Sequence, residues 1–180
     1  MTGDFIGWGK IPRLFREVVI TEKLDGTNGC LVIDDDGGFA VQSRNRHITP
    51  ESDNHGFAQW AYDNQHNLIA DLGVGYHFGE WWGLGIQRNY GLDHKRFSLF
   101  NPRHWGREFT VPQLDAVPIL VEGMFSEWLV DHELRRLRIQ GSVAAPGFAN
   151  PEGIVIHHKQ GNLRFKVTLE GDAVPKGGTR

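Results

Sequence analysis

Apolar and polar residues alternate with a period of two along residues 17–24, and the β-branched residues there favour an extended chain. The alternation predicts a strand that carries Lys23 and Asp25 on one face. The opposite face is apolar and consists of Val18, Ile20 and Leu24. Because the strand runs into the glycine-containing turn at 26–29, we expect a lysine beside a carboxylate at the mouth of a turn.

The same alternation predicts an antiparallel meander after this turn. Residues 30–34 and 39–44 are typical of strands, and the Asp-Gly-Gly sequence between them supplies the positive φ that tight hairpins need. The meander returns Arg44 toward the end of the sheet at which Lys23 lies. Residues 76–87, 95–102 and 117–123 predict further strands.

Two segments show apolar spacings of three and four residues and are predicted to be helices. The first extends from Phe57 to Leu72 and ends at the glycines that follow it. The second begins after Ser126, a favourable N-cap residue, and continues to about Gln140.

The last predicted unit is a hairpin formed by residues 152–157 and 163–169. In its second strand the apolar residues share one face, which leaves Arg164 and Lys166 together on the other. Two cations are therefore expected to point into one place.

The two ends of the chain are predicted to be irregular. The first sixteen residues contain glycine and proline, and we expect their large apolar residues to anchor them: Trp8, Ile11, Leu14 and Phe15. Residues 171–180 combine Pro175 with several glycines, which predicts a flexible tail.

Composition narrows the class of protein. A chain of 180 residues with 39 % apolar residues is long enough for one core, so we expect a single domain over residues 1–170. A net charge of −3 excludes a positive field over the whole protein that would attract nucleic acid. Any binding of a polyanion must therefore depend on a local cluster of basic residues. Cys30 is the only cysteine, which excludes an intrachain disulfide. With no apolar run long enough to span a membrane, we expect a soluble, cytoplasmic protein.

The residues Lys23-Leu24-Asp25-Gly26 resemble the K-x-D-G signature of the covalent nucleotidyltransferases, the polynucleotide ligases and mRNA capping enzymes. The continuation Gly26-Thr27-Asn28 is most similar to the RNA ligase 2 branch. A lone lysine at a strand end is more often an edge charge, but four further elements follow in family order. They are the S-R-N element at Arg44, the G-E-x-x-G-x-G-I-Q element at Glu80, the E-G-I-V element at Glu152, and the K-x-K element at Arg164 and Lys166.

The resemblance implies an α+β fold of antiparallel sheets flanked by helices, a ligase-type, ATP-grasp-like nucleotidyltransferase domain with ATP in the groove between sheets. It implies catalytic roles for Lys23, Asp25, Arg164 and Lys166. The residues that it implies for nucleotide binding are Glu22, Lys23, Asn28, Arg44, Glu80, Phe100, Glu152, Arg164 and Lys166. Mg²⁺ or Mn²⁺ would be held near Asp25, Glu80 and Glu152.

Two positions depart from the family pattern. Arg164 stands where a lysine is usual, which keeps the charge but changes the donor geometry. Asn101 replaces the aspartate that normally follows the purine-stacking phenylalanine, here Phe100, with Phe97 as the alternative. Without the resemblance, Arg44 would be interpreted as a surface charge.

The function that the resemblance implies is that of an ATP-dependent RNA ligase. Lys23 would carry AMP as a phosphoramidate, transfer it to a 5′-phosphate end and assist sealing to a 3′-hydroxyl. Lysine is nucleophilic only without its proton, a state that nearby cations favour. Three alternatives stay open: a minimal ATP-dependent DNA ligase, a capping-type guanylyltransferase and a non-catalytic module that binds nucleotides or RNA ends.

The expected partners are ATP and RNA ends, including nicked duplexes, with no membrane involved. Ligases of this kind often carry an extra domain that wraps the nucleic acid, and residues after Lys166 are too few for one. We therefore expect a partner protein or dimerisation to assist end binding.

Overall fold

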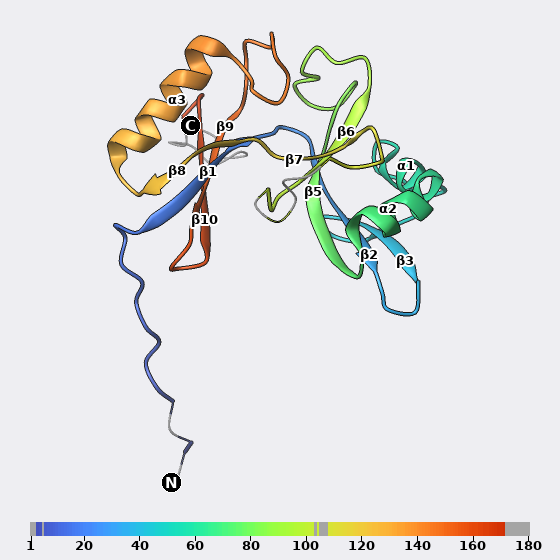
Figure 1. The fold of residues 1–180 in the computed structure, drawn as a ribbon, viewed down its shortest axis with the longest axis horizontal. Coiled ribbons are helices and arrows are strands. Elements are labelled where there is room, and N and C mark those ends of the chain that lie inside the picture. The colour runs from blue at the N-terminus through green and yellow to red at the C-terminus, as the bar shows by residue number, and fades with distance from the viewer. Residues whose placement is uncertain (1–2, 5, 103, 105–107, 172–180) are drawn as a thin grey trace, which may run out of the picture.

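A computed structural model describes residues 3–4, 6–102, 104 and 108–171, and the predicted tail after residue 171 lies outside them. The chain forms two sheets that lie side by side (Figure 1). The smaller sheet has four antiparallel strands in the order β10-β9-β1-β8. These strands are β1 (Glu17–Lys23), β8 (Ile119–Met124), β9 (Gly153–His158) and β10 (Leu163–Thr168).

The larger sheet has six strands in the order β4-β3-β2-β5-β6-β7. Its pairs are antiparallel except for β6 and β7, which run parallel. The strands are β2 (Thr27–Ile33), β3 (Phe39–Ser43), β4 (His47–Ile48), β5 (Gly75–Gly83), β6 (Lys95–Leu99) and β7 (Leu114–Ala116). The predicted α+β class with antiparallel sheets is confirmed.

Helix α3 (Glu127–Gln140) covers the outer face of the smaller sheet. It begins as predicted, because the Ser126 hydroxyl accepts a hydrogen bond from the backbone N–H of Leu129 at 3.2 Å. Its inner side packs on the apolar face of the sheet, in a core that consists of Val18, Ile20, Leu120, Leu137, Ile154 and Ile156. Only the opposite face of this sheet is left for chemistry.

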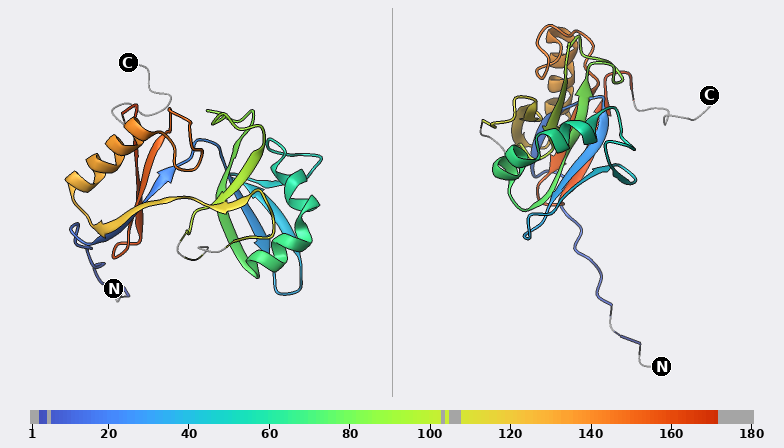
Figure 2. Two further views of the ribbon diagram at one scale, coloured as in Figure 1. Left: turned by 45° about the horizontal axis from the view of Figure 1, so that its top comes forward. Right: turned by 90° about the vertical axis from the view of Figure 1, so that its right-hand side faces the viewer.

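The predicted helix 57–72 is instead two helices, α1 (Phe57–Asp63) and α2 (Gln65–Leu72). The break falls at Asn64, whose φ of −108° leaves the helical range. Its side-chain amide donates to the carbonyl of Trp60 at 2.8 Å, a local bond that competes with the regular helical pattern. Both helices cover the outer face of the larger sheet and bury its main core (Figure 2).

Two short connections join the sheets, residues 24–26 between β1 and β2 and residues 117–118 between β7 and β8. The backbone N–H of Glu22 donates to the carbonyl of Pro118 at 3.0 Å, which ties the second connection to the end of β1. A third apolar cluster fills this junction and includes Leu24, Trp82, Tyr90, Val117 and Ala145. The mouth of the predicted turn therefore lies where the sheets meet.

The apolar residues of the N-terminal segment are not anchors, contrary to the prediction. Trp8 is 91 % exposed and Ile11 79 % exposed, and Leu14 is also exposed. Phe15 makes one ring contact, with Phe125 at 6.1 Å. The apolar pattern was too sparse to identify a partner surface. No helix within the described residues is both long and apolar enough to cross a membrane.

Candidate active site

A cavity of about 570 Å³ lies between the two sheets. The smaller sheet lines it with the face that α3 leaves open, through Val19, Thr21, Lys23, Val155, His157, Arg164 and Lys166. This set follows from the pleat, because alternate residues of β1, β9 and β10 point to the same side. The larger sheet and the loop after β6 contribute Asn28, Arg44, Glu80, Phe100 and Asn101. Most of the predicted site residues therefore meet in one place.

Lys23 lies at the end of β1, opposite Gly153 of β9. This register places it beside Glu152, and its Nζ lies 2.6 Å from Glu152 Oε2. The Glu152 side chain is only 4 % exposed, whereas that of Lys23 is 21 % exposed and lines the cavity. The ion pair holds the amine at the cavity wall while leaving one side of it open.

Arg164 and Lys166 lie on the same face of the exposed strand β10 and both line the cavity. Lys166 is in register with Val155, which in turn pairs with Thr21 of β1. Neither cation has a hydrogen bond or ion pair with another described residue. Two unneutralised charges thus face the cavity that also holds Lys23, an arrangement suited to an anionic ligand.

Glu80 is buried on β5, directly opposite Asn28 of β2. Its carboxylate accepts hydrogen bonds from the Gly26 backbone N–H at 3.0 Å and from Asn28 Nδ2 at 2.6 Å. Burial raises the pKa of Glu80 to about 7, although the positive charge of Lys23 opposes the shift. The carboxylate is thus fixed in orientation and titrates near neutral pH.

The turn after Lys23 requires glycine at position 26. A Cβ atom there would lie 2.3 Å from the carbonyl oxygen of Trp81 and 2.8 Å from the Cβ of Trp82. Such contacts cannot be relieved, because the first is with backbone of β5. Gly26 therefore lets the turn approach β5 closely enough for its N–H to reach Glu80.

Of the two aromatic residues proposed for stacking, only Phe100 is available to a ligand. Phe100 is 39 % exposed and lines the cavity. Phe97 is fully buried, with its ring 4.7 Å from that of Phe57 in the main core. Asn101, the departure from the family pattern, lines the cavity beside Phe100.

Asp25 is engaged by residues that the sequence analysis did not identify. Its Oδ2 lies 3.0 Å from Arg88 Nε, and its backbone N–H donates to the hydroxyl of Tyr90 at 2.8 Å. Arg88 also pairs with Glu170 at 2.9 Å. Arg88 and Tyr90 directly follow the G-I-Q element at 85–87, where the backbone adopts several positive φ values. Their place beside this element was the sequence signal that could have identified them.

Glu22 is among the residues that line the cavity, so its predicted role in nucleotide binding stays a prediction. Its carboxylate is engaged by the loop after α3. It accepts hydrogen bonds from the Ser142 hydroxyl at 2.6 Å and from the N–H groups of Val143 and Ala144 at 2.8 and 3.0 Å. Burial raises the pKa of Glu22, and the three donors oppose that shift. Glu22 anchors the loop after α3 because it lies on the opposite face of β1 from Lys23.

The three carboxylates expected to hold a metal ion do not form a cluster. Asp25 is paired with Arg88, Glu80 is bonded to the turn, and Glu152 is paired with Lys23. Across the described ranges, no three His, Cys, Asp or Glu residues are grouped so that they could hold a metal ion. Asp25, Glu80 and Glu152 therefore stay a predicted metal set, and among the described residues they do not form a ready-made cage.

Comparisons with known proteins identify the family and the fold. The RNA ligase family model matches residues 16–168 of the chain, which include all the residues named above as lining the cavity. No curated protein sequence matches it. Among solved structures, a mutant of the Naegleria gruberi RNA ligase with ATP and Mn matches with a TM-score of 0.58 and 20 % identity, over 86 % of this chain and 49 % of that one.

A second mutant of the Naegleria gruberi ligase, with AMP and Mn, matches with a TM-score of 0.60 and 20 % identity, over 87 % of this chain and 51 % of that one. The present chain thus spans about half the length of these structures. At such identity they show a shared fold. The family match extends over most of the chain, and the protein therefore belongs to the RNA ligase family.

Proposed function

We propose that the protein is an ATP-dependent RNA ligase whose described residues form the adenylylating unit. The amine of Lys23 would attack the α-phosphorus of ATP, forming lysyl-AMP and releasing pyrophosphate. AMP would then pass to a 5′-phosphate end, and attack by a 3′-hydroxyl would join the ends and release AMP. One observation carries the proposal: Lys23 opens into the same cavity as Arg164 and Lys166, two cations without an ion pair among the described residues.

The cavity matches the parts of a nucleotide one by one. Its volume lies in the range of ordinary small-molecule sites. Phe100 offers a face for the purine. The Glu80 carboxylate, held beside Asn28, is an acceptor for a ribose hydroxyl. Arg164 and Lys166 supply the positive charge that a polyphosphate requires.

The charges also describe how Lys23 would become a nucleophile. Before a ligand binds, Glu152 lies 2.6 Å from the amine and stabilises its position. Attack on a phosphorus requires the amine to lose its proton, and Glu152 is within hydrogen-bond distance to receive it. Arg164 and Lys166 would stabilise the negative charge that develops on the phosphoryl oxygens.

Mg²⁺ or Mn²⁺ would bind together with the polyphosphate, and not at a site formed by protein ligands alone. Magnesium in such sites keeps several waters and takes few carboxylates in addition to substrate phosphates. Glu80 and Glu152 are the carboxylates beside Lys23 that remain candidates. The metal would neutralise phosphate charge, and Asp25 would position the turn through its pair with Arg88.

The test is the intact mass of the protein after incubation with ATP and magnesium. We expect a gain that corresponds to AMP, and we expect Lys23→Ala to remove it while the protein stays folded. Lys159→Ala is the matched control, because Lys159 pairs with Glu17 and Glu122 outside the cavity. A labelled adduct that persists on Lys23→Ala contradicts the assignment, and a parent chain without an adduct supports the non-catalytic alternative.

The nucleotide and the polynucleotide are separated by two further comparisons on the same protein. Labelling with ATP against GTP distinguishes a ligase from a capping-type enzyme. Matched nicked duplexes with RNA or DNA on the 3′-hydroxyl side then distinguish RNA sealing from DNA sealing.

A further inference from the structure

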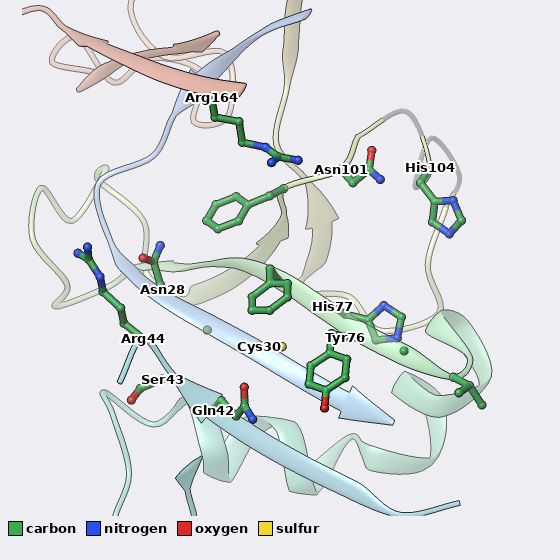
Figure 3. Close-up of a pocket in the computed structure, with 15 residues that line it drawn as sticks. Asn28, Cys30, Gln42, Ser43, Arg44, Tyr76, His77, Asn101, His104 and Arg164 are labelled. Atoms are coloured by element: carbon green, nitrogen blue, oxygen red, sulfur yellow. The ribbon is translucent and has the colours of Figure 1, made fainter. Parts of the chain in front are cut away.

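A second cavity, of about 700 Å³, lies on the open face of the larger sheet beside the candidate nucleotide site (Figure 3). The two cavities are continuous at their border, where they share Asn28, Arg44, Phe100, Asn101 and Arg164. None of the functions proposed above uses the remainder of this surface. The side chains that line this remainder therefore suit a ligand other than the nucleotide.

The floor of this cavity is a pair of exposed aromatic rings on β5. Tyr76 is opposite Val32 and Phe78 is opposite Cys30, so both side chains point to the open face together with Glu80. Tyr76 is 66 % exposed and Phe78 is 56 % exposed. Their ring centroids lie 6.3 Å apart with planes only 15° from parallel. They form an exposed pair of nearly parallel rings that extends away from the nucleotide cavity.

Cations stand at the end of this surface that adjoins the nucleotide cavity. Arg44 follows β3 and Arg164 lies on β10, so they reach the border from different sheets (Figure 3). Neither has a hydrogen bond or ion pair with any other residue that the structure describes. Gln42 and Ser43 add amide and hydroxyl groups along the rim.

We propose that this second cavity binds unpaired nucleotides at the end of the nucleic acid, with bases stacked on Tyr76 and Phe78 and phosphates on Arg44 and Arg164. The inference rests on the proposed function, because the terminal 5′-phosphate would then lie at the border where AMP is transferred. A groove that combines aromatic faces with cations is the arrangement by which proteins hold single strands.

The geometry favours single strands over duplexes and over a protein partner. Bases in a duplex are already stacked on their neighbours, so their faces are unavailable to Tyr76 and Phe78. A protein interface would gain little from leaving the two arginines unpaired at its border, since buried unpaired charge is costly. Continuity with the nucleotide cavity gives a polyanion a direct path between the two.

The test compares two short 5′-phosphorylated oligomers, a single-stranded RNA and an abasic strand with the same phosphates, by fluorescence anisotropy. We expect the double variant Tyr76→Ala/Phe78→Ala to bind the RNA at least about tenfold more weakly, since each lost stack on an aromatic ring has an effect of about this size or larger. Affinity for the abasic strand should change by less than about twofold. Tyr76→Phe/Phe78→Tyr keeps both rings and should keep RNA affinity.

Trp128→Ala is the matched control, because Trp128 is a similarly exposed aromatic residue, 69 % exposed, on helix α3. Thermal unfolding of each variant establishes that it is folded, and the single variant Tyr76→Ala replaces the double one if the latter unfolds. Equal RNA affinity of the folded variant and the parent overturns the proposal. So does an equal loss of affinity for both oligomers.

The outcomes also separate this proposal from the adenylylation of Lys23. A parent chain that forms no AMP adduct, yet loses RNA affinity on removal of the two rings, refutes the ligase activity and supports the subsite. An adduct with unchanged RNA affinity does the reverse. Light scattering that shows a dimer lost with the rings, without a change in RNA affinity, identifies the surface as a protein interface and overturns the proposal.

Discussion

The two sheets meet at one cavity but present different chemistry to it. The smaller sheet contributes the amine of Lys23 and the cations Arg164 and Lys166, which have no ion pair with another described residue. The larger sheet contributes an oriented carboxylate, Glu80, and aromatic faces, with Phe100 at the border. Arg44, just after β3, is the one cation that the larger sheet brings to this cavity among the described residues.

This difference indicates a division of labour. Phosphate chemistry depends on concentrated positive charge, whereas sugars and bases are held by directional acceptors and flat apolar surfaces. We therefore expect substitutions on the smaller sheet to change the rate of reaction with ATP. Substitutions on the larger sheet should change the affinity for the nucleotide. The first and last of the following predictions test that separation, and the second tests the environment of Glu80.

The largest effect is expected on the smaller sheet. Removing both cations with Arg164→Ala/Lys166→Ala should slow formation of the AMP adduct by about a hundredfold to a thousandfold, because the developing phosphoryl charge loses its donors. Single-turnover mass spectrometry with ATP in excess measures the rate. Arg135→Ala, an exposed arginine on α3, is the control. A rate within twofold of the parent would show that these side chains do not face the reacting phosphate.

An intermediate effect is expected from Glu80 on the larger sheet, as a change in pH dependence. Burial raises the pKa of Glu80 from 4.5 to about 7, so the folded state binds this proton more tightly than the unfolded state. Its contribution to stability is complete below pH 4.5 and is lost as pH rises through 7. Up to about 3 kcal/mol of unfolding free energy would be lost across this window.

Glu80→Gln carries no titrating group and should flatten this slope, which urea unfolding at pH values on either side of the window measures. Glu127→Gln replaces an exposed carboxylate of α3 and should leave the slope in place. A Glu80→Gln protein with the parent's slope would show that another group governs it.

The smallest effect is expected from Phe100. Replacing it by alanine should weaken AMP binding by about tenfold through loss of the stacking face, whereas Phe100→Tyr should retain affinity. Titration calorimetry with AMP measures both. Phe97→Leu is the informative contrast, because its ring is in the main core and the substitution should lower the unfolding temperature instead. An AMP affinity that depends on Phe97 and not Phe100 would reverse the assignment.

The sequence predicted those parts of the site that follow from alternation along single strands. Lys23 faces away from Val18 and Ile20 because a strand has a period of two, and the same rule brings Arg164 and Lys166 together. What it could not predict are contacts that depend on distant partners. The Glu22 carboxylate accepts from Ser142, which lies 120 residues later, and Asp25 pairs with Arg88. Neither contact can be predicted from the local pattern of apolar and polar residues.

Two further differences have local causes. The helix break at Asn64 depends on a side-chain bond to Trp60, which apolar spacing does not register. The aromatic floor was not predicted, because Glu80 was the one residue of this strand that the family resemblance identified. Their period-two spacing with Glu80 was the available signal, since three residues on one face of a strand must point to the same side.

The short connection between β1 and β2 limits how the molecule admits its ligands. Residues 24–26 are all that join the amine-bearing strand to the strand that carries Asn28. Four peptide steps span at most about 14 Å, so the sheets cannot swing widely apart while β1 and β2 stay intact. Any widening of the groove must therefore take place away from this connection, where the sheets are free to rotate about it. For protein engineering, chain breaks or inserted tags belong at the solvent-facing hairpin of residues 34–37 and not at this connection.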